Sequence, residues 1–169
     1  MIKKLLELAG VEPERFNLKW CSSAEAQRFV DIVTGMIGTI KELGPLGSGR
    51  SSGEALKKNL TAARDAISGE RLRWLLGKEY NLETSANTFG EKFTEEKYRE
   101  MLDVSVRDEF YKSRILNLTR EKTLSVKDMA PELGLDAAEV LRLVTMLRGR
   151  NIVDVKEVKG TSPLYTALV

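Results

Sequence analysis

The last third of the chain limits the fold most strongly, because its pattern changes there from helical to extended. Ser125 precedes an apolar-periodic run, and its hydroxyl can accept a hydrogen bond from a first-turn amide. Asp136 and Glu139 have the spacing of a capping box, which predicts a further helix from Ala137 to Leu147. Gly134 suits the left-handed residue that ends the helix before it. The pattern therefore predicts two helices joined by a tight turn.

Extended segments follow these helices. The second helix has apolar residues at intervals of three and four, which predicts a buried stripe of Val140, Leu141, Val144 and Leu147. Ile152–Val158 and Pro163–Leu168 have strand patterning, and Gly160 allows a tight turn between them. With a helical run at Tyr111–Leu118 in front, this order resembles a winged helix. We predict a mainly α chain with a helical N-terminal and middle region, a C-terminal winged helix-turn-helix and a small β wing.

Composition predicts where the chain divides. The segment LGSGRSSG at residues 46–53 is rich in glycine and serine, which is typical of a linker. It separates residues 1–45 from a helical region at 54–104, and the winged-helix domain is predicted at 105–169.

The first segment shows several local patterns. Residues 2–9 are predicted to form a short amphipathic helix, and the alternation in Phe16–Trp20 predicts a short strand. Ser22 and Glu25 have capping-box spacing and are predicted to open a long helix. The apolar positions of that helix are Phe29, Val33, Met36, Ile37 and Ile40.

The middle region is predicted to be helical with two interruptions. Gly69 interrupts the helix that begins at Glu54, and the polar segment Asn81–Gly90 is predicted to be a loop. Thr94 is predicted to cap a helix that runs through Val106.

Charge and composition restrict the functions that the chain can perform. The net charge is +2, and the excess lies in residues 105–169, which have 11 basic and 9 acidic residues. Dedicated nucleic-acid binders usually carry a larger basic excess. The chain has one cysteine and no histidine, so we expect no metal site, no cofactor bound by this chain alone and no catalytic centre of its own. The charged start and the lack of a long apolar run predict a cytoplasmic protein without a membrane partner.

One stretch resembles a known family. Residues Val11–Glu25 read VEPERFNLKWCSSAE, and the likeness extends over residues 2–45. This segment is similar to the C-terminal part of the methyl-viologen-reducing hydrogenase delta subunit family. Members of that family are iron–sulfur proteins that pass electrons between a hydrogenase or similar donor and heterodisulfide reductase. The family's cluster-binding cysteines lie upstream of the similar segment. Since a [2Fe–2S] cluster usually takes four thiolates and this chain has one, no cluster ligand is carried over to any position here.

Two candidate sites remain. Cys21 is either a redox-active thiol before a helix N-terminus or a small buried apolar residue at a strand end. The second candidate is a basic face of the winged helix, where candidate contacts for nucleic acid or a partner protein are Arg142, Thr145, Arg148, Arg150, Lys156 and Lys159. These side chains are consistent with phosphate contact, with protein docking or with a solvated surface. Glu139 is expected to complete the helix cap with Asp136.

These observations predict a non-catalytic accessory or C-terminal domain of an electron-transfer complex of the heterodisulfide-reductase or hydrogenase type. Such a domain would dock on partner subunits that carry the iron–sulfur cluster or flavin. The alternative is a winged-helix transcriptional regulator that binds DNA.

Overall fold

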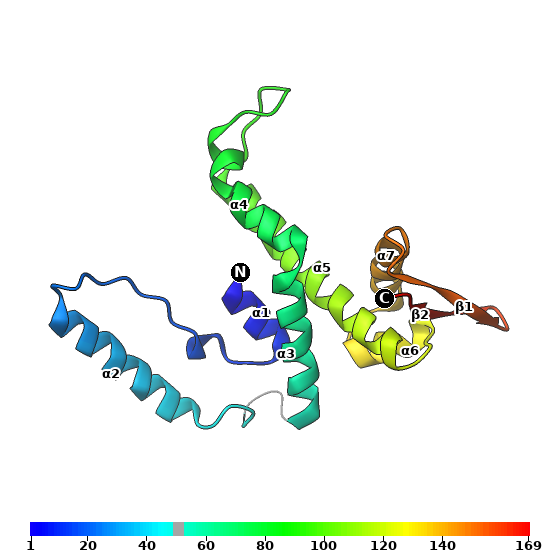
Figure 1. The fold of residues 1–169 in the computed structure, drawn as a ribbon, viewed down its shortest axis with the longest axis horizontal. Helices are drawn as coiled ribbons and strands as arrows, with labels where there is room; N and C mark the ends of the chain where they lie inside the picture. Colours follow the sequence, from blue (N-terminus) through cyan, green and yellow to red (C-terminus); the bar gives the residue numbers. More distant parts are fainter. Residues whose placement is uncertain (49–52) are drawn as a thin grey trace. The chain divides into compact units, whose positions relative to one another are not determined.

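A computed structural model describes residues 1–48 and 53–169, which form seven α-helices, one short 3-10 helix and one two-stranded antiparallel sheet (Figure 1). The prediction of a mainly α chain with a small C-terminal β wing is confirmed. Two compact units are present, Met1–Thr61 and Ala62–Val169, and α3 (Gly53–Ser68) contributes to both. Of the predicted linker 46–53, residues 49–52 lie outside the described residues. Within the described ranges, no helix is both long and apolar enough to cross a bilayer.

The first unit has a small core. Besides the start of α3, its elements are α1 (Ile2–Ala9), η1 (Pro13–Arg15) and α2 (Ala26–Leu43). Its buried side chains among the described residues are Leu5, Ala9, Val11 and Leu56. Gly10 ends α1 with φ at 82°, a left-handed conformation that glycine adopts without steric cost. The Arg15 guanidinium donates to the carbonyls of Gly44, at 2.9 Å, and of Leu43, at 3.1 Å, and so ties η1 to the end of α2.

Two predictions for this unit were wrong. Phe16–Trp20 forms no strand, because no neighbouring strand is present among the described residues to form the ladder that an extended segment needs. Ser22 and Glu25 do not cap α2, which begins after them at Ala26. Instead, Glu25 accepts from the Ser22 amide at 2.8 Å, while the Ser22 hydroxyl accepts from the Ala24 amide at 3.3 Å. The same residues thus close a separate turn before the helix.

The second unit begins with a helical hairpin. After the end of α3, α4 (Glu70–Thr84) and α5 (Glu95–Glu121) pack against each other, joined by residues 85–94. Tyr98 is buried between them and donates its hydroxyl to the Leu75 carbonyl at 3.1 Å. Thr94 caps α5 as predicted, accepting from the Lys97 amide at 3.2 Å. The predicted loop at Asn81–Gly90 was partly wrong, because α4 continues through Thr84.

The remainder of the second unit packs around the C-terminal half of α5. Helix α5 is continuous across the boundary predicted between residues 104 and 105. It is followed by α6 (Val126–Leu133), α7 (Ala137–Arg148), β1 (Val153–Lys159) and β2 (Ser162–Ala167). These elements share one core of Ile115, Leu118, Leu124, Met129, Leu133, Val140, Leu143, Val144, Leu147, Val153 and Tyr165. The predicted caps are present: Ser125 forms a capping box with Asp128, and Gly134 ends α6 with φ at 65°.

One member of the predicted stripe on α7 was wrong. Leu141 is 48% exposed, and Leu143 is buried in its place. A stripe of period 3.6 that contains Val140, Val144 and Leu147 continues through position 143, whereas position 141 lies about 100° away from position 140 around the helix. The sequence prediction placed Leu141 in the stripe because apolar residues occupy both position 141 and position 143.

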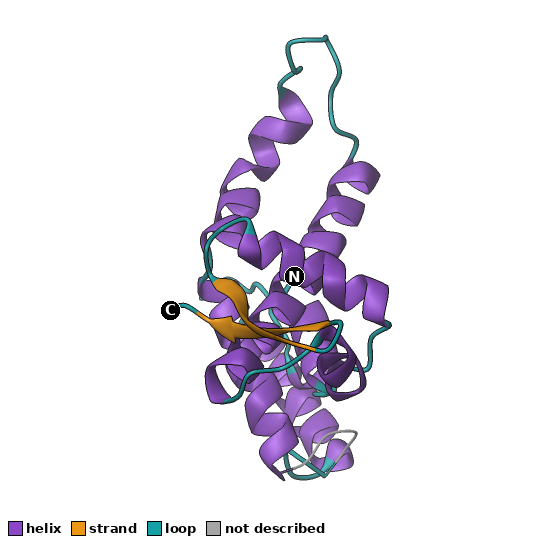
Figure 2. Ribbon diagram, turned by 90° about the vertical axis from the view of Figure 1, so that its right-hand side faces the viewer, coloured by secondary structure: helices purple, strands orange, loops and turns teal. Residues whose placement is uncertain are grey.

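The hairpin of β1 and β2, drawn in orange in Figure 2, is anchored to the chain before α6 by a bridge between Tyr165 and Leu124. The strands pair from Val153–Ala167 to Lys159–Ser162, with an irregularity between Val155 and Glu157. At the other edge of β2, Tyr165 exchanges both backbone hydrogen bonds with Leu124, at 2.8 and 3.1 Å. Because Tyr165 is also in the core, the hairpin is held against the helices by both its backbone and a side chain.

Candidate interaction surfaces

An apolar face of α2 is exposed within the first unit. Phe29, Val33, Ile37 and Ile40 recur at intervals of three and four, and we call them the α2 face. Their exposed fractions lie between 36% and 57%, and α2 contributes no buried residue to the unit. Apolar surface gathered on one side of a helix usually marks an interaction site, whereas scattered apolar residues do not.

Cys21 lies in the segment between η1 and α2 and is exposed. The interpretation of this residue as a buried apolar group at a strand end was therefore wrong, because neither the burial nor the strand is present. Its role as a redox thiol stays a prediction. Among the described residues, no group of three or more Cys, His, Asp or Glu side chains is arranged to hold a metal ion.

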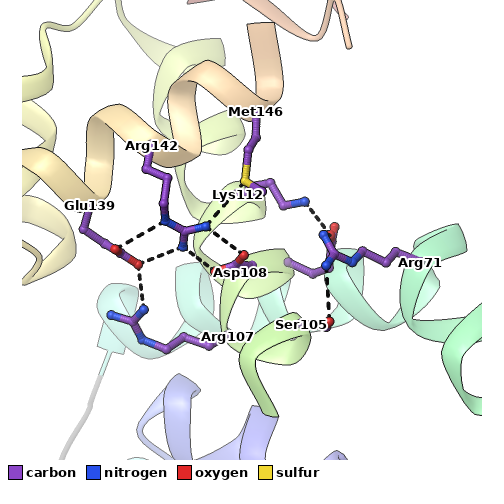
Figure 3. A network of polar contacts seen from close by, with 9 residues as sticks. Arg71, Ser105, Arg107, Asp108, Lys112, Glu139, Arg142 and Met146 are labelled. Carbon is purple, nitrogen blue, oxygen red and sulfur yellow. Dashed lines mark hydrogen bonds and ion pairs between the residues drawn. The ribbon is translucent and has the colours of Figure 1, made fainter. Parts of the chain in front are cut away.

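Arg142, a predicted contact residue, is engaged within the protein. Its guanidinium donates two hydrogen bonds to the carboxylate of Asp108 on α5, at 2.6 and 3.1 Å (Figure 3). It also donates to Glu139 at 3.0 Å, and Arg107 donates to the same carboxylate at 2.7 Å. We call Arg107, Asp108, Glu139 and Arg142 the α5–α7 clamp. Paired N–H groups that match both oxygens of a carboxylate make this one of the stronger polar contacts available to side chains.

The clamp changes the role that was expected of Glu139. The Asp136 carboxylate does accept from the Glu139 amide, at 2.8 Å. The Glu139 carboxylate, however, bonds to the arginines and does not complete the cap. Hydrogen bonds from Arg142 and then Arg107 hold the pKa of Glu139 below its ordinary value, because they favour its charged form. Hydrogen bonds also raise the pKa of Arg142, with Asp108 as the largest cause and Glu139 as the next.

A second polar group lies beside the clamp on α5. Lys112 is buried and forms an ion pair with Glu109, which lies 3.7 Å from the Arg71 guanidinium on α4. Arg71 also approaches the Ser105 hydroxyl at 3.4 Å. Of these residues, only Arg142 and Glu139 were singled out from the sequence. The spacing of Ser105, Asp108, Lys112, Ile115 and Thr119, at intervals of three and four, is visible in the sequence, but only the structure shows that all five are buried.

The other predicted contact residues have different surroundings. Arg148 donates to Asp154 on β1 at 3.0 Å, and the Thr145 hydroxyl bonds to a carbonyl of its own helix. Arg150 lines an open cavity of about 620 Å³ with Glu70, Arg71 and Trp74. Lys156 and Lys159 are exposed on β1. The structure thus does not gather the six predicted side chains into one free basic face.

Comparisons with known proteins match the first segment. Residues 1–44 match the family model described as methyl-viologen-reducing hydrogenase, delta subunit. The iron-sulfur subunit of the F420-non-reducing hydrogenase vhu of Methanopyrus kandleri is 57% identical over 44 residues, which are 26% of this chain and 33% of that protein. The iron-sulfur subunit of the F420-non-reducing hydrogenase of Archaeoglobus profundus is 42% identical over 45 residues, 27% of this chain and 33% of that protein.

A heterodisulfide reductase is also similar in one of its subunits. The matching subunit of the ferredoxin:CoB-CoM heterodisulfide reductase of Methanosarcina mazei is 32% identical over 62 residues, 37% of this chain and 7% of that protein. This chain therefore spans about a third of the length of the hydrogenase relatives and a small part of the reductase relative. No solved structure matches. Residues 1–44 carry a domain of the delta subunit of methyl-viologen-reducing hydrogenases, which confirms the resemblance seen in the sequence.

Proposed function

We propose that this chain is a non-catalytic accessory component of an electron-transfer complex of the hydrogenase or heterodisulfide-reductase type. It docks through the α2 face on a partner subunit that carries an iron–sulfur cluster or a flavin. One observation supports this most directly: the segment shared with hydrogenase and reductase subunits is also the segment whose long helix exposes an apolar face.

The size of the α2 face is sufficient to contribute to docking. Complete burial of a large apolar side chain stabilises a complex by roughly 1.5–3 kcal/mol. Covering four side chains that are already about half buried therefore contributes about 4 kcal/mol before the costs of association.

The side chains of this chain do not fit the iron–sulfur cluster that the family carries. A cluster held by four thiolates needs four cysteines, and the sequence has one. In the proposed complex, the cofactors are held by the partner subunits, and this chain supplies a docking surface.

The proposal is tested by measuring binding to subunits encoded in the same genome. The purified full chain is titrated by calorimetry with each heterodisulfide reductase subunit in turn, then with each hydrogenase subunit. We expect Phe29→Glu/Ile37→Glu to weaken binding at least tenfold without loss of helix, because both side chains are exposed in the free chain. Gly35→Glu, on the opposite side of α2 where an added side chain meets nothing within 4 Å, is the matched control and should bind like the wild type. Absence of binding at 100 µM of every subunit, or equal binding by the double variant, would contradict the proposal.

The alternative is a winged-helix DNA-binding regulator. The order α5, α6, α7, β1, β2 and the exposed Lys156 and Lys159 on the hairpin favour it. The internal pairing of Arg142 and Arg148 weighs against it. Affinity for a DNA duplex that falls steeply with salt would support this alternative over docking.

A further inference from the structure

A groove opens on the second unit between the starts of α6 and α7 and the hairpin. Its volume is about 390 Å³. It is lined by Ser125, Val126, Lys127, Ala137, Ala138, Leu141, Thr161, Ser162, Pro163 and Tyr165. Most of these side chains are apolar or small, so the groove differs in chemistry from the charged clamp on the α5 side of α7.

Leu141 of α7 is one of the apolar side chains that line the groove. This residue is 48% exposed, whereas Val140, Leu143, Val144 and Leu147 of the same helix are buried in the core. Across the groove, Pro163 pairs with Val158 in the β1–β2 register, so the two side chains share one face of the hairpin. Val158 is 63% exposed. Leu141 and Pro163 therefore form apolar walls of the groove, and the exposed Val158 extends the apolar surface next to Pro163.

The groove has one lysine in its lining and a second lysine at the end of β1. Asp128 accepts from the amide and hydroxyl of Ser125, and Asp136 accepts from a helix amide, so both nearby carboxylates serve as caps. Lys127 lines the groove, and Lys159 ends β1. Neither lysine forms an ion pair within the described part of the chain. Lys159 lies close enough to Asp128 to help lower the pKa of that carboxyl, after the larger effect of the two Ser125 hydrogen bonds.

We propose that this groove binds an acidic, apolar segment of a partner protein. One or two large apolar side chains of the segment enter between Leu141 and Pro163, and its carboxylates meet Lys127 and Lys159. A cavity of about 390 Å³ is near the lower end of the range of roughly 300–1,000 Å³ seen for ligand sites, which suits anchoring side chains. A nucleic acid fits less well, because its phosphates would have to lie against apolar walls. This site is separate from the α2 face and extends the proposed function.

The segment is identified by selection and then used as the probe. Random dodecapeptides displayed on phage are selected on the full-length chain, and the most enriched peptide is synthesised for fluorescence anisotropy. We expect selected peptides that combine Leu or Phe with Asp or Glu. Leu141→Gln should weaken the synthesised peptide about tenfold, because it removes an apolar wall. Lys127→Glu/Lys159→Glu should weaken it about fivefold, the effect of two exposed charge contacts.

Matched control variants distinguish the loss of this binding site from a general effect of changing exposed residues. Leu76→Gln and Lys78→Glu alter an exposed leucine and lysine on α4 and should change the affinity less than twofold. The Phe29→Glu/Ile37→Glu variant should bind the peptide unchanged, so failure of the α2 proposal leaves this result intact. Several outcomes would overturn the inference: no enriched peptide, selection of basic peptides, equal binding by Leu141→Gln, or displacement of the peptide by a 24-base-pair DNA duplex.

Discussion

Replacing Arg142 with alanine should destabilise the second unit more than replacing Arg148, the other arginine of α7. The substitution removes both hydrogen bonds to Asp108, whose side chain is only 4% exposed. Breaking a buried ion pair from one side costs roughly 3–5 kcal/mol, because the remaining charge is left without a partner. The Arg142 side chain is itself 41% exposed, so water can partly replace it. We therefore expect a loss of about 2–3 kcal/mol.

Urea unfolding followed by far-UV circular dichroism measures this loss. With a slope of about 2 kcal/mol per molar urea, the transition of the second unit should shift down by about 1–1.5 M. Arg148→Ala is the matched control, because Arg148 pairs with Asp154 at 3.0 Å in a contact about half exposed on both sides. An exposed pair contributes at most about 1 kcal/mol, and its removal should shift the transition by less than about 0.5 M.

The comparison between the two arginines decides the role of the clamp. Equal, small shifts for Arg142→Ala and Arg148→Ala would refute the reasoning, since they would show that Arg142 is held no more firmly than a surface residue. Arg142→Lys should recover only part of the loss, because an ammonium group cannot match both carboxylate oxygens as a guanidinium does. A variant with both Asp108→Asn and Arg142→Met should be more stable than Arg142→Ala, because it leaves no unpaired buried charge.

Further changes test other parts of the second unit. Ser125→Ala removes the cap of α6 and should cost about 1 kcal/mol, measured as a lower Tm. Tyr98→Phe removes a buried hydrogen bond to a carbonyl of α4 and should cost a similar amount, about 1 kcal/mol by urea unfolding. The pKa of Glu139 is held down by Arg142 and then by Arg107, so its contribution to stability is present above its unfolded pKa and is lost as the pH falls through the lower folded value. The Tm difference between the wild type and Glu139→Gln should therefore shrink between pH 6 and pH 3; a constant difference would contradict this.

Local chemistry made both ends of α6 predictable from the sequence. Ser125 and Gly134 depend on backbone groups within a few residues of themselves, so their caps could be inferred without knowledge of the fold. Phe16–Trp20 shows the opposite case, because alternation makes a strand only where another strand lies alongside. For α7 the helix itself was predicted correctly, but one residue of its buried face was not. Leu143 is buried where Leu141 was expected.

The clamp was beyond reach of the sequence pattern because its partners are distant along the chain. Asp108 and Arg142 are separated by 34 positions and meet only when α5 packs on α7. The buried face of α5 also lacks a continuous apolar stripe, because Ser105, Asp108 and Lys112 occupy it. Such polar positions are stable in a core only with partners, and those partners became visible only in the folded arrangement.

Pairing also changes what the charge of the second unit means for function. Residues 105–169 have an excess of two basic residues, which by itself leaves DNA contact and protein docking open. In the structure, Arg107, Lys112, Arg142 and Arg148 form ion pairs with carboxylates of the same unit. Beside the groove, Lys127 on α6 and Lys159 on the hairpin lack an ion pair within the described residues. The wall that α7 contributes to the groove is apolar. A surface of this kind is better matched to a carboxylate-bearing protein segment than to a phosphate backbone, which supports the proposed docking.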